Sequence, residues 1–222
     1  MNILSIETSS TACSAALLTD NDCLEIFKVE PRGHSQLILT MIEQLLSECE
    51  ISVNQLSAIA FARGPGSFTG LRIGAGVVQG IAYAADLPVI PVSTLATLSQ
   101  AGYEEHQHRY WATAIDARMK EVYWGVYKVN DLGYVESMSD EVVSLPQLVD
   151  LNASFDFSGI GDGWAEYPQL NDRFKLDCVI SDVLPRAKYV ASLASHSFKQ
   201  GLMKTAFDAV PVYLRNNVVH QK

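Results

Sequence analysis

The sequence predicts a mixed α/β protein built from two similar units. Three observations lead to this fold class. Three short strand-like segments open the chain, helical and strand-like segments alternate after them, and a similar order of segments begins again near residue 109. The chain has 222 residues, of which 48% are hydrophobic and 18% charged, so it can bury a core as one domain or as two small ones.

The first unit occupies about the first hundred residues. Its strands are expected at residues 2–7, 13–18, 23–29, 56–61 and 87–92. Apolar residues recur at steps of three and four between residues 35 and 50, and again between 68 and 85, which predicts two helices. The order is βββαβαβ, so we expect an antiparallel meander joined to parallel crossover connections.

The second unit is a looser copy of the first. Its strands are expected at residues 110–116, 121–129, 134–138 and 155–160, with a helical turn at 145–151 and a late helix at 188–200. The polar stretch at 103–109 is expected to be the linker. The predicted lobes are therefore residues 1–103 and 104–222, with the extreme C-terminus packing back on the first lobe.

The segment from Arg63 to Gly74 is rich in glycine and joins a strand to a helix. Its first glycines allow backbone angles closed to other residues, and Ser67 or Thr69 could cap the helix and leave free N–H groups at its start. Such a geometry suits an anion. The segment matches neither a Walker loop nor a dinucleotide fingerprint, so it either holds phosphate or packs a helix tightly.

A doubled βββαβα unit describes the actin-like, ribonuclease H-like (ASKHA) architecture of actin, sugar kinases and heat-shock ATPases, which has two lobes. In that fold a nucleotide lies between the lobes, held by hairpins and glycine turns. The candidate nucleotide-binding residues here are Thr8, Gly64, Gly66, Gly161 and Gly163. Glu7 and Asp116 end the first strand of each unit, and we interpret them as structural hairpin residues rather than catalytic acids.

Charge and composition exclude several functions. The net charge of −9 disfavours direct binding to nucleic acid, which needs clustered Lys and Arg. The four scattered cysteines indicate reduced thiols, not a disulfide frame or a metal site. The first residues do not resemble a signal peptide and no apolar run is long enough for a membrane span, so we expect a cytoplasmic protein without membrane contact.

Several motifs, in order along the chain, resemble the TsaB (YeaZ) family. They are residues 3–9 (ILSIETS), the glycine segment, 90–95 (IPVSTL), 116–118 with 121–123 (DAR and EVY), 161–163 (GDG) and 211–215 (PVYLR). This family takes part in making the threonylcarbamoyl modification of the adenosine beside the tRNA anticodon. The first half also resembles TsaD, the catalytic paralogue, which shares the fold.

The metal site of TsaD-type proteins has no counterpart among these residues. Those proteins place a His-x-x-x-His pair directly after an Ile-Pro-Val strand. The equivalent residues 93–98 (STLATL) contain neither histidine nor carboxylate, so we expect no metal ligands in this chain. The resemblance therefore implies a non-catalytic scaffold or activator subunit.

The resemblance also implies partners. The chain would pair with itself and with a TsaD-type synthase, in a complex that also engages a TsaE-type ATPase, and would contact tRNA only through that complex. ATP or ADP could lie at the joint interface. The interface residues expected on the first two helices are Leu37, Ile38, Met41, Leu45, Gly70, Leu71, Ile73, Gly74, Val77, Val78 and Ile81. The alternative function is a small actin-fold phosphotransferase that uses ATP.

Overall fold

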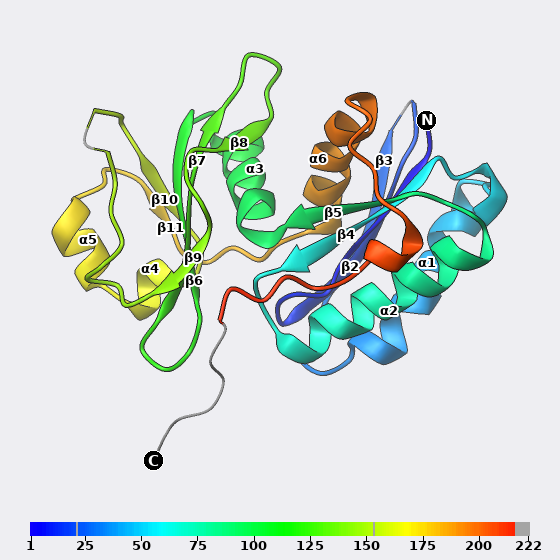
Figure 1. Cartoon of the computed structure of the whole chain (residues 1–222), viewed down its shortest axis with the longest axis horizontal. Helices are drawn as coiled ribbons and strands as arrows, with labels where there is room; N and C mark the ends of the chain where they lie inside the picture. Colours follow the sequence, from blue (N-terminus) through cyan, green and yellow to red (C-terminus); the bar gives the residue numbers. More distant parts are fainter. Residues whose placement is uncertain (21, 153, 216–222) are drawn as a thin grey trace.

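The computed structural model describes residues 1–20, 22–152 and 154–215, and it contains two mixed sheets side by side (Figure 1). The first sheet has the strand order β3-β2-β1-β4-β5. Its strands are β1 (Ile3–Glu7), β2 (Ala12–Leu18), β3 (Cys23–Val29), β4 (Ala58–Gly64) and β5 (Val89–Ser93). The first three pair antiparallel, and β4 and β5 extend the sheet in parallel, which confirms the predicted meander and crossovers.

The second sheet repeats the beginning of this order. Its path is β11-β10-β6-β7-β8, and β9 pairs separately with β7. Its strands are β6 (Tyr110–Asp116), β7 (Val122–Val129), β8 (Val135–Ser137), β9 (Val142–Ser144), β10 (Ser158–Ile160) and β11 (Val179–Ile180). The predicted repetition of three antiparallel strands followed by a parallel strand is confirmed.

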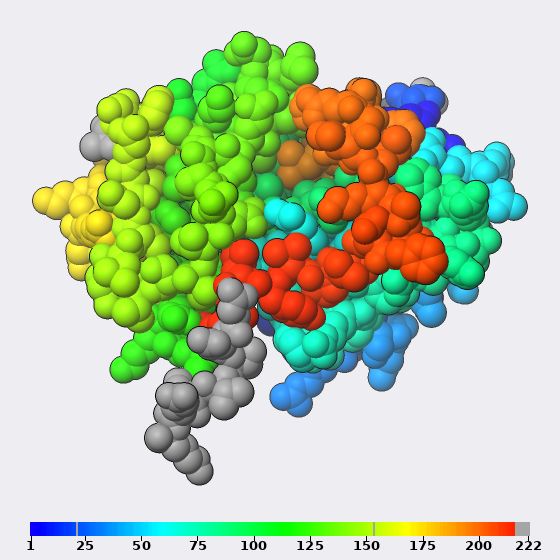
Figure 2. Space-filling model, in the orientation of Figure 1, coloured from blue at the N-terminus to red at the C-terminus, as the bar shows by residue number. Residues whose placement is uncertain are grey.

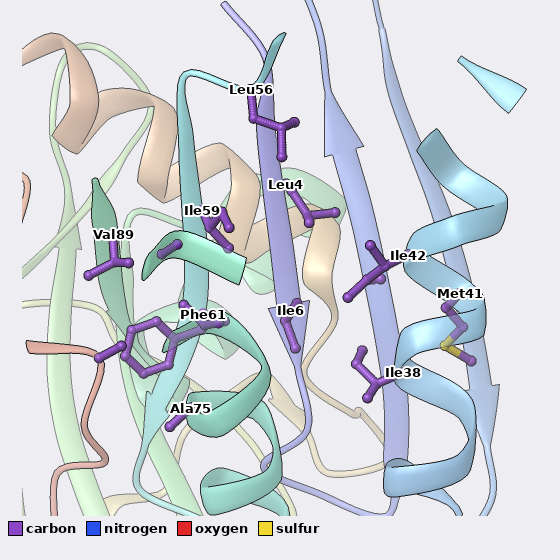
Figure 3. Close-up of a cluster of buried hydrophobic side chains, with 14 of the residues drawn as sticks. Leu4, Ile6, Ile38, Met41, Ile42, Leu56, Ile59, Phe61, Ala75 and Val89 are labelled. Atoms are coloured by element: carbon purple, nitrogen blue, oxygen red, sulfur yellow. The ribbon is translucent and has the colours of Figure 1, made fainter. Parts of the chain in front are cut away.

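Two helices cover one face of the first sheet. They are α1 (His34–Glu48), which packs on β2, and α2 (Phe68–Ala84), which packs on β4. A short 3-10 turn, η1 (Val53–Gln55), precedes β4. Figure 3 shows the core that they close, in which apolar side chains from alternate strand positions, such as Leu4 and Ile6, meet Ile38 and Ala75.

Two further helices fill the space between the sheets (Figure 1). They are α3 (Thr94–His106), which packs on β6 and β7, and α6 (Ala187–Lys199), which packs on β1, β2 and β4. The small helices α4 (Gly163–Glu166) and α5 (Gln169–Phe174) lie on the second sheet's far side, and η2 (Ala206–Asp208) follows α6. The core between the sheets contains Trp111, Tyr127 and Val190, so both lobes contribute to it.

Three expectations need correction. The linker expected at residues 103–109 is wrong in its first part, because a helix that was not predicted, α3, continues through His106. The helical turn expected at 145–151 is reduced to a single turn at residues 145–148, closed by a hydrogen bond of 2.9 Å from the Leu148 N–H to the Leu145 carbonyl, and no helix follows it. The late helix forms as predicted, but it packs on the first sheet: Ser5 donates a hydrogen bond to the carbonyl of Ala187 at 2.8 Å.

The division into lobes at residue 103 stays a prediction. After α6 the chain returns along the first lobe, where Lys204 and Val89 exchange two backbone hydrogen bonds of 2.9 Å. Residues 216–222, the extreme C-terminus of the expectation, lie outside the described residues. Among the described residues, no helix is both long and apolar enough to cross a membrane.

Candidate functional site

The glycine segment packs α2 against the chain's own first hairpin. Ser67 caps the helix, its hydroxyl accepting the Gly70 N–H, and its own N–H donates to the Ser9 carbonyl at 2.6 Å. A Cβ on Gly70 would collide with the backbone oxygen of Thr8, and one on Gly74 with the Thr8 hydroxyl. These two glycines therefore serve internal packing, and their predicted place in a partner interface is corrected.

Most of the other predicted interface residues face the core as well. Ile38, Leu45 and Val78 are completely buried, and Met41 and Leu71 are nearly so. A buried side chain cannot touch a partner unless the chain rearranges, so these five also leave the candidate surface. Four predicted residues remain partly exposed beside it: Leu37, Ile73, Val77 and Ile81.

The outer face of α2 has almost no charge and contains two open glycines. Arg72 is the helix's single charged residue in 17 positions. Gly76 and Gly80 are exposed, and a Cβ on either would meet nothing within 4 Å. A glycine in a helix interior costs about 1 kcal/mol relative to alanine. Within the described chain no packing contact explains this cost.

A strap of residues 202–215 runs along α2 on the surface, where Figure 2 shows it in orange-red to red. Its aromatic side chains meet those of the helix at both ends. The Tyr83 and Phe207 rings lie 5.8 Å apart, and the Phe68 and Tyr213 rings 5.6 Å apart. All four rings are exposed, so the strap and the outer face of α2 form one largely apolar surface, which we call the α2–strap face.

A cleft of about 860 Å³ lies between the two lobes. Its lining comes from the β1–β2 hairpin, the starts of α1, α2 and α3, the β6–β7 turn and the strap. Of the five predicted nucleotide-binding residues, only Gly66 lines this cleft. Thr8 is buried and donates to the Gly70 carbonyl, and Gly161 and Gly163 pack against Ala114.

The remaining predicted glycine, Gly64, ends β4 at φ +109°, in the left-handed region that favours glycine. A Cβ there would press against the Leu71 side chain and the Val212 carbonyl. Its role is therefore close packing between α2 and the strap.

Carboxylates at the cleft are held by neighbours. Asp116 pairs with Arg118 at 3.1 Å and accepts a hydrogen bond from the Tyr167 hydroxyl at 2.7 Å. Asp162 accepts the Asp116 N–H at 2.9 Å, and burial raises the pKa of Asp162. Glu7 is completely buried and does not line the cleft. The expected structural role of Glu7 therefore agrees with its position.

Residues 94–98, where no metal ligand is expected, form the start of α3. Thr94, Leu95 and Leu98 are buried there, and Ser93 caps the helix by accepting two N–H groups. These side chains offer neither imidazole nor carboxylate, which are the usual protein ligands of catalytic metals. No group of three or more potential ligands assembles within the part of the chain that the structure describes.

Gly76 and Gly80 could be identified from the sequence, because two glycines four residues apart within a predicted helix are costly and indicate a close approach of another backbone. Sequence reasoning missed two other candidates. The strap aromatics carried no signal in the sequence, since their approach to α2 depends on the path of the chain after α6. The Asp116–Tyr167 contact likewise joins residues 51 positions apart.

The fold and this surface define a two-lobed α/β protein of the actin-like class with an unpartnered helix face. Comparison with known proteins gives the family. A family model described as TsaD, tRNA N6-adenosine threonylcarbamoyltransferase, matches residues 28–221. The chain belongs to the TsaB family within that wider group, since relatives named tRNA threonylcarbamoyladenosine biosynthesis protein TsaB align with it over its full length.

The degree of similarity is even across these relatives. The protein from Haemophilus influenzae is 40% identical, over 100% of this chain and 97% of its own. The one from Escherichia coli is 39% identical, over 100% of this chain and 98% of its own. The solved structure of YeaZ from Pseudomonas aeruginosa is 40% identical with a TM-score of 0.90, covering 96% of this chain and 99% of its own.

Proposed function

We propose that this chain is a non-catalytic subunit in tRNA threonylcarbamoyladenosine biosynthesis. It pairs with a TsaD-type synthase, and with a second copy of itself when alone, through the outer face of α2 and the neighbouring part of α1. The synthase, together with a TsaE-type ATPase, performs the transfer to tRNA. The acidic net charge of −9 supports this division, because tRNA contacts then belong to the partner.

The observation that carries the proposal is the pair of open glycines on α2. Gly76 and Gly80 each destabilise the helix without relieving any contact with the described residues of this chain. Because these two residues have no side chains, the backbone of another helix can approach the backbone of α2 closely. Ile73 and Val77 beside them supply apolar area for burial in such a contact.

The subunit would act on its partner by a shift of populations. A protein that binds one conformer of the synthase better than another stabilises that conformer, without contributing a catalytic group. The residues that start α3 support this assignment, since they offer no imidazole or carboxylate where TsaD-type proteins place their metal ligands.

A charge on the α2 face tests the proposal. We expect Gly80→Lys to fold normally, because the site is open, and to abolish co-purification with a TsaD-type synthase, because a lysine would have to be buried in the contact. Leu132→Lys is the matched control, since Leu132 is 72% exposed on the other lobe. Equal recovery of the synthase with both variants would contradict the proposed interface.

The cleft favours a second candidate, a phosphotransferase that uses ATP. Its volume of about 860 Å³ is that of a small-molecule site, and Asp116 and Asp162 line it. Calorimetric titration with ATP and Mg²⁺ separates the two functions. Sub-millimolar binding with turnover by the purified chain would overturn the non-catalytic assignment.

A further inference from the structure

The strap touches both lobes, and its first anchor is α2. Arg72 donates from Nε to the Tyr213 hydroxyl at 3.0 Å, and its guanidinium lies 3.7 Å from the centre of the Phe68 ring. Tyr213 is therefore held between the hydrogen bond from Arg72 and the ring of Phe68. A partner that covers the start of α2 must also cover Tyr213, which is 44% exposed at the same place.

The second anchor of the strap lies on the other lobe. The strap leaves the first lobe at Val212, whose N–H donates to the carbonyl of Arg63 in β4 at 2.8 Å, and three residues later Arg215 reaches the β6–β7 turn. The Arg215 guanidinium donates to the Ala117 carbonyl at 3.0 Å and pairs with the carboxylate of Glu121. The Arg215 side chain is only 17% exposed, so these contacts are shielded from water.

The turn that Arg215 holds has an uncommon backbone. Arg118, Met119 and Lys120 have φ of +61°, +57° and +64°, so three successive residues other than glycine are left-handed. This conformation is disfavoured for L-residues and persists where surrounding contacts impose it. Two hydrogen bonds of 3.0 Å close the turn, from the Ala117 N–H to the Glu121 carbonyl and from the Glu121 N–H to the Arg118 carbonyl.

The same turn forms part of the cleft wall. Asp116, Ala117 and Arg118 line the cleft, and Arg215 lines it with them. Any change in the strap's position therefore acts on a strained turn at the edge of that cavity. These contacts therefore connect α2 to the turn without a break. Phe68 and Arg72 contact Tyr213, and two residues later Arg215 contacts the turn.

We propose that the strap couples the α2–strap face to the cleft. A helical partner that docks on α2 fixes Tyr213, which orders the strap, and the strap in turn stabilises the left-handed turn at residues 117–121 through Arg215. The partner is the one of the proposed function, so the inference rests on that function. Coupling of this kind does not require the backbone to move. A segment that is already ordered at one end loses less conformational entropy when its other end becomes ordered.

The free chain tests the strap without any partner. We expect Tyr213→Ala to raise the hydrogen-exchange rates of the Ala117 and Glu121 amides about tenfold, the effect of losing one hydrogen bond to a charged group. Arg215→Gln should do the same, and Leu132→Ala, which truncates an exposed residue away from the strap, should not. Unchanged exchange at both amides in a folded Tyr213→Ala chain would overturn the proposal.

The complex provides the second measurement. When a TsaD-type synthase binds, exchange should slow along α2 and also, about tenfold, at the Ala117 and Glu121 amides. Arg215→Gln should abolish the slowing at these two amides and leave that along α2. Protection of α2 without protection of the turn would refute the coupling. Absence of any complex would refute the proposed function instead, and the free-chain experiment would still decide the role of the strap.

Discussion

At the scale of a single residue, the burial of one carboxyl group gives the fold a dependence on pH. Glu7 lies at the end of β1 with no exposed surface. Burial raises the pKa of Glu7 from 4.5 to about 7, and the hydrogen bond from the Ser9 N–H lowers it by less. A group whose pKa is raised on folding stabilises the folded state below its unfolded pKa, and this contribution is lost as the pH rises through the folded pKa.

The variant Glu7→Gln tests this effect. Between pH 4.5 and 7 the Glu7 carboxyl ionises in the unfolded chain while it stays mainly protonated in the folded one, so the unfolding free energy of the native chain should fall by about 3 kcal/mol. A glutamine at this position does not ionise and should not contribute this pH dependence. Urea denaturation over this pH range measures the difference between the two proteins. Glu43→Gln, at an exposed position on α1, should follow the native chain. Parallel pH profiles for Glu7→Gln and the native chain would contradict the assignment.

At the scale of elements, α2 contains glycines of two kinds, and alanine distinguishes them. Gly76→Ala and Gly80→Ala should each raise the unfolding free energy by about 1 kcal/mol, because the sites are open and alanine favours the helix. Gly70→Ala should lower it, because its Cβ would collide with the Thr8 carbonyl. Thermal and urea denaturation measure both. Destabilisation by all three would mean that the outer face is also packed within the chain.

The sequence patterns predicted α1 and the buried strands β1 and β2 closely, but they missed the helix α3. The helix α1 buries an apolar face with Ile38, Met41 and Leu45, although Leu39 is exposed, and its observed bounds, His34–Glu48, differ by one or two residues from those expected. In α3, polar Thr97, Ser99 and Gln100 are buried beside Leu98, so no apolar stripe marks the helix. Thr97 and Ser99 satisfy their hydroxyls by donating to carbonyls four residues earlier, a local solution that composition does not reveal.

At the scale of the whole molecule, the pairing of the main strands was predictable, whereas the positions of the helices between the two sheets were not. Local periodicity predicted α6, but placing it on the first sheet depends on contacts such as Ser5 with Ala187, which are 182 residues apart. The same dependence on long-range packing explains why most of the predicted interface residues are buried. A helix pattern identifies an apolar side, and the apolar side of α1 and α2 is mainly the core. The spacing of the α2 glycines indicated a close approach, but only the structure distinguishes the packed Gly70 and Gly74 from the open Gly76 and Gly80.

The central claim concerns the whole molecule: the chain promotes tRNA modification by docking on a synthase, without supplying catalytic groups. Reconstituted threonylcarbamoyl transfer to tRNA by the TsaD-type and TsaE-type proteins tests it most directly. Modification should depend on adding this chain, fail with Gly80→Lys and proceed with Leu132→Lys. Modification at the same rate without the chain, or with Gly80→Lys in its place, would contradict the claim.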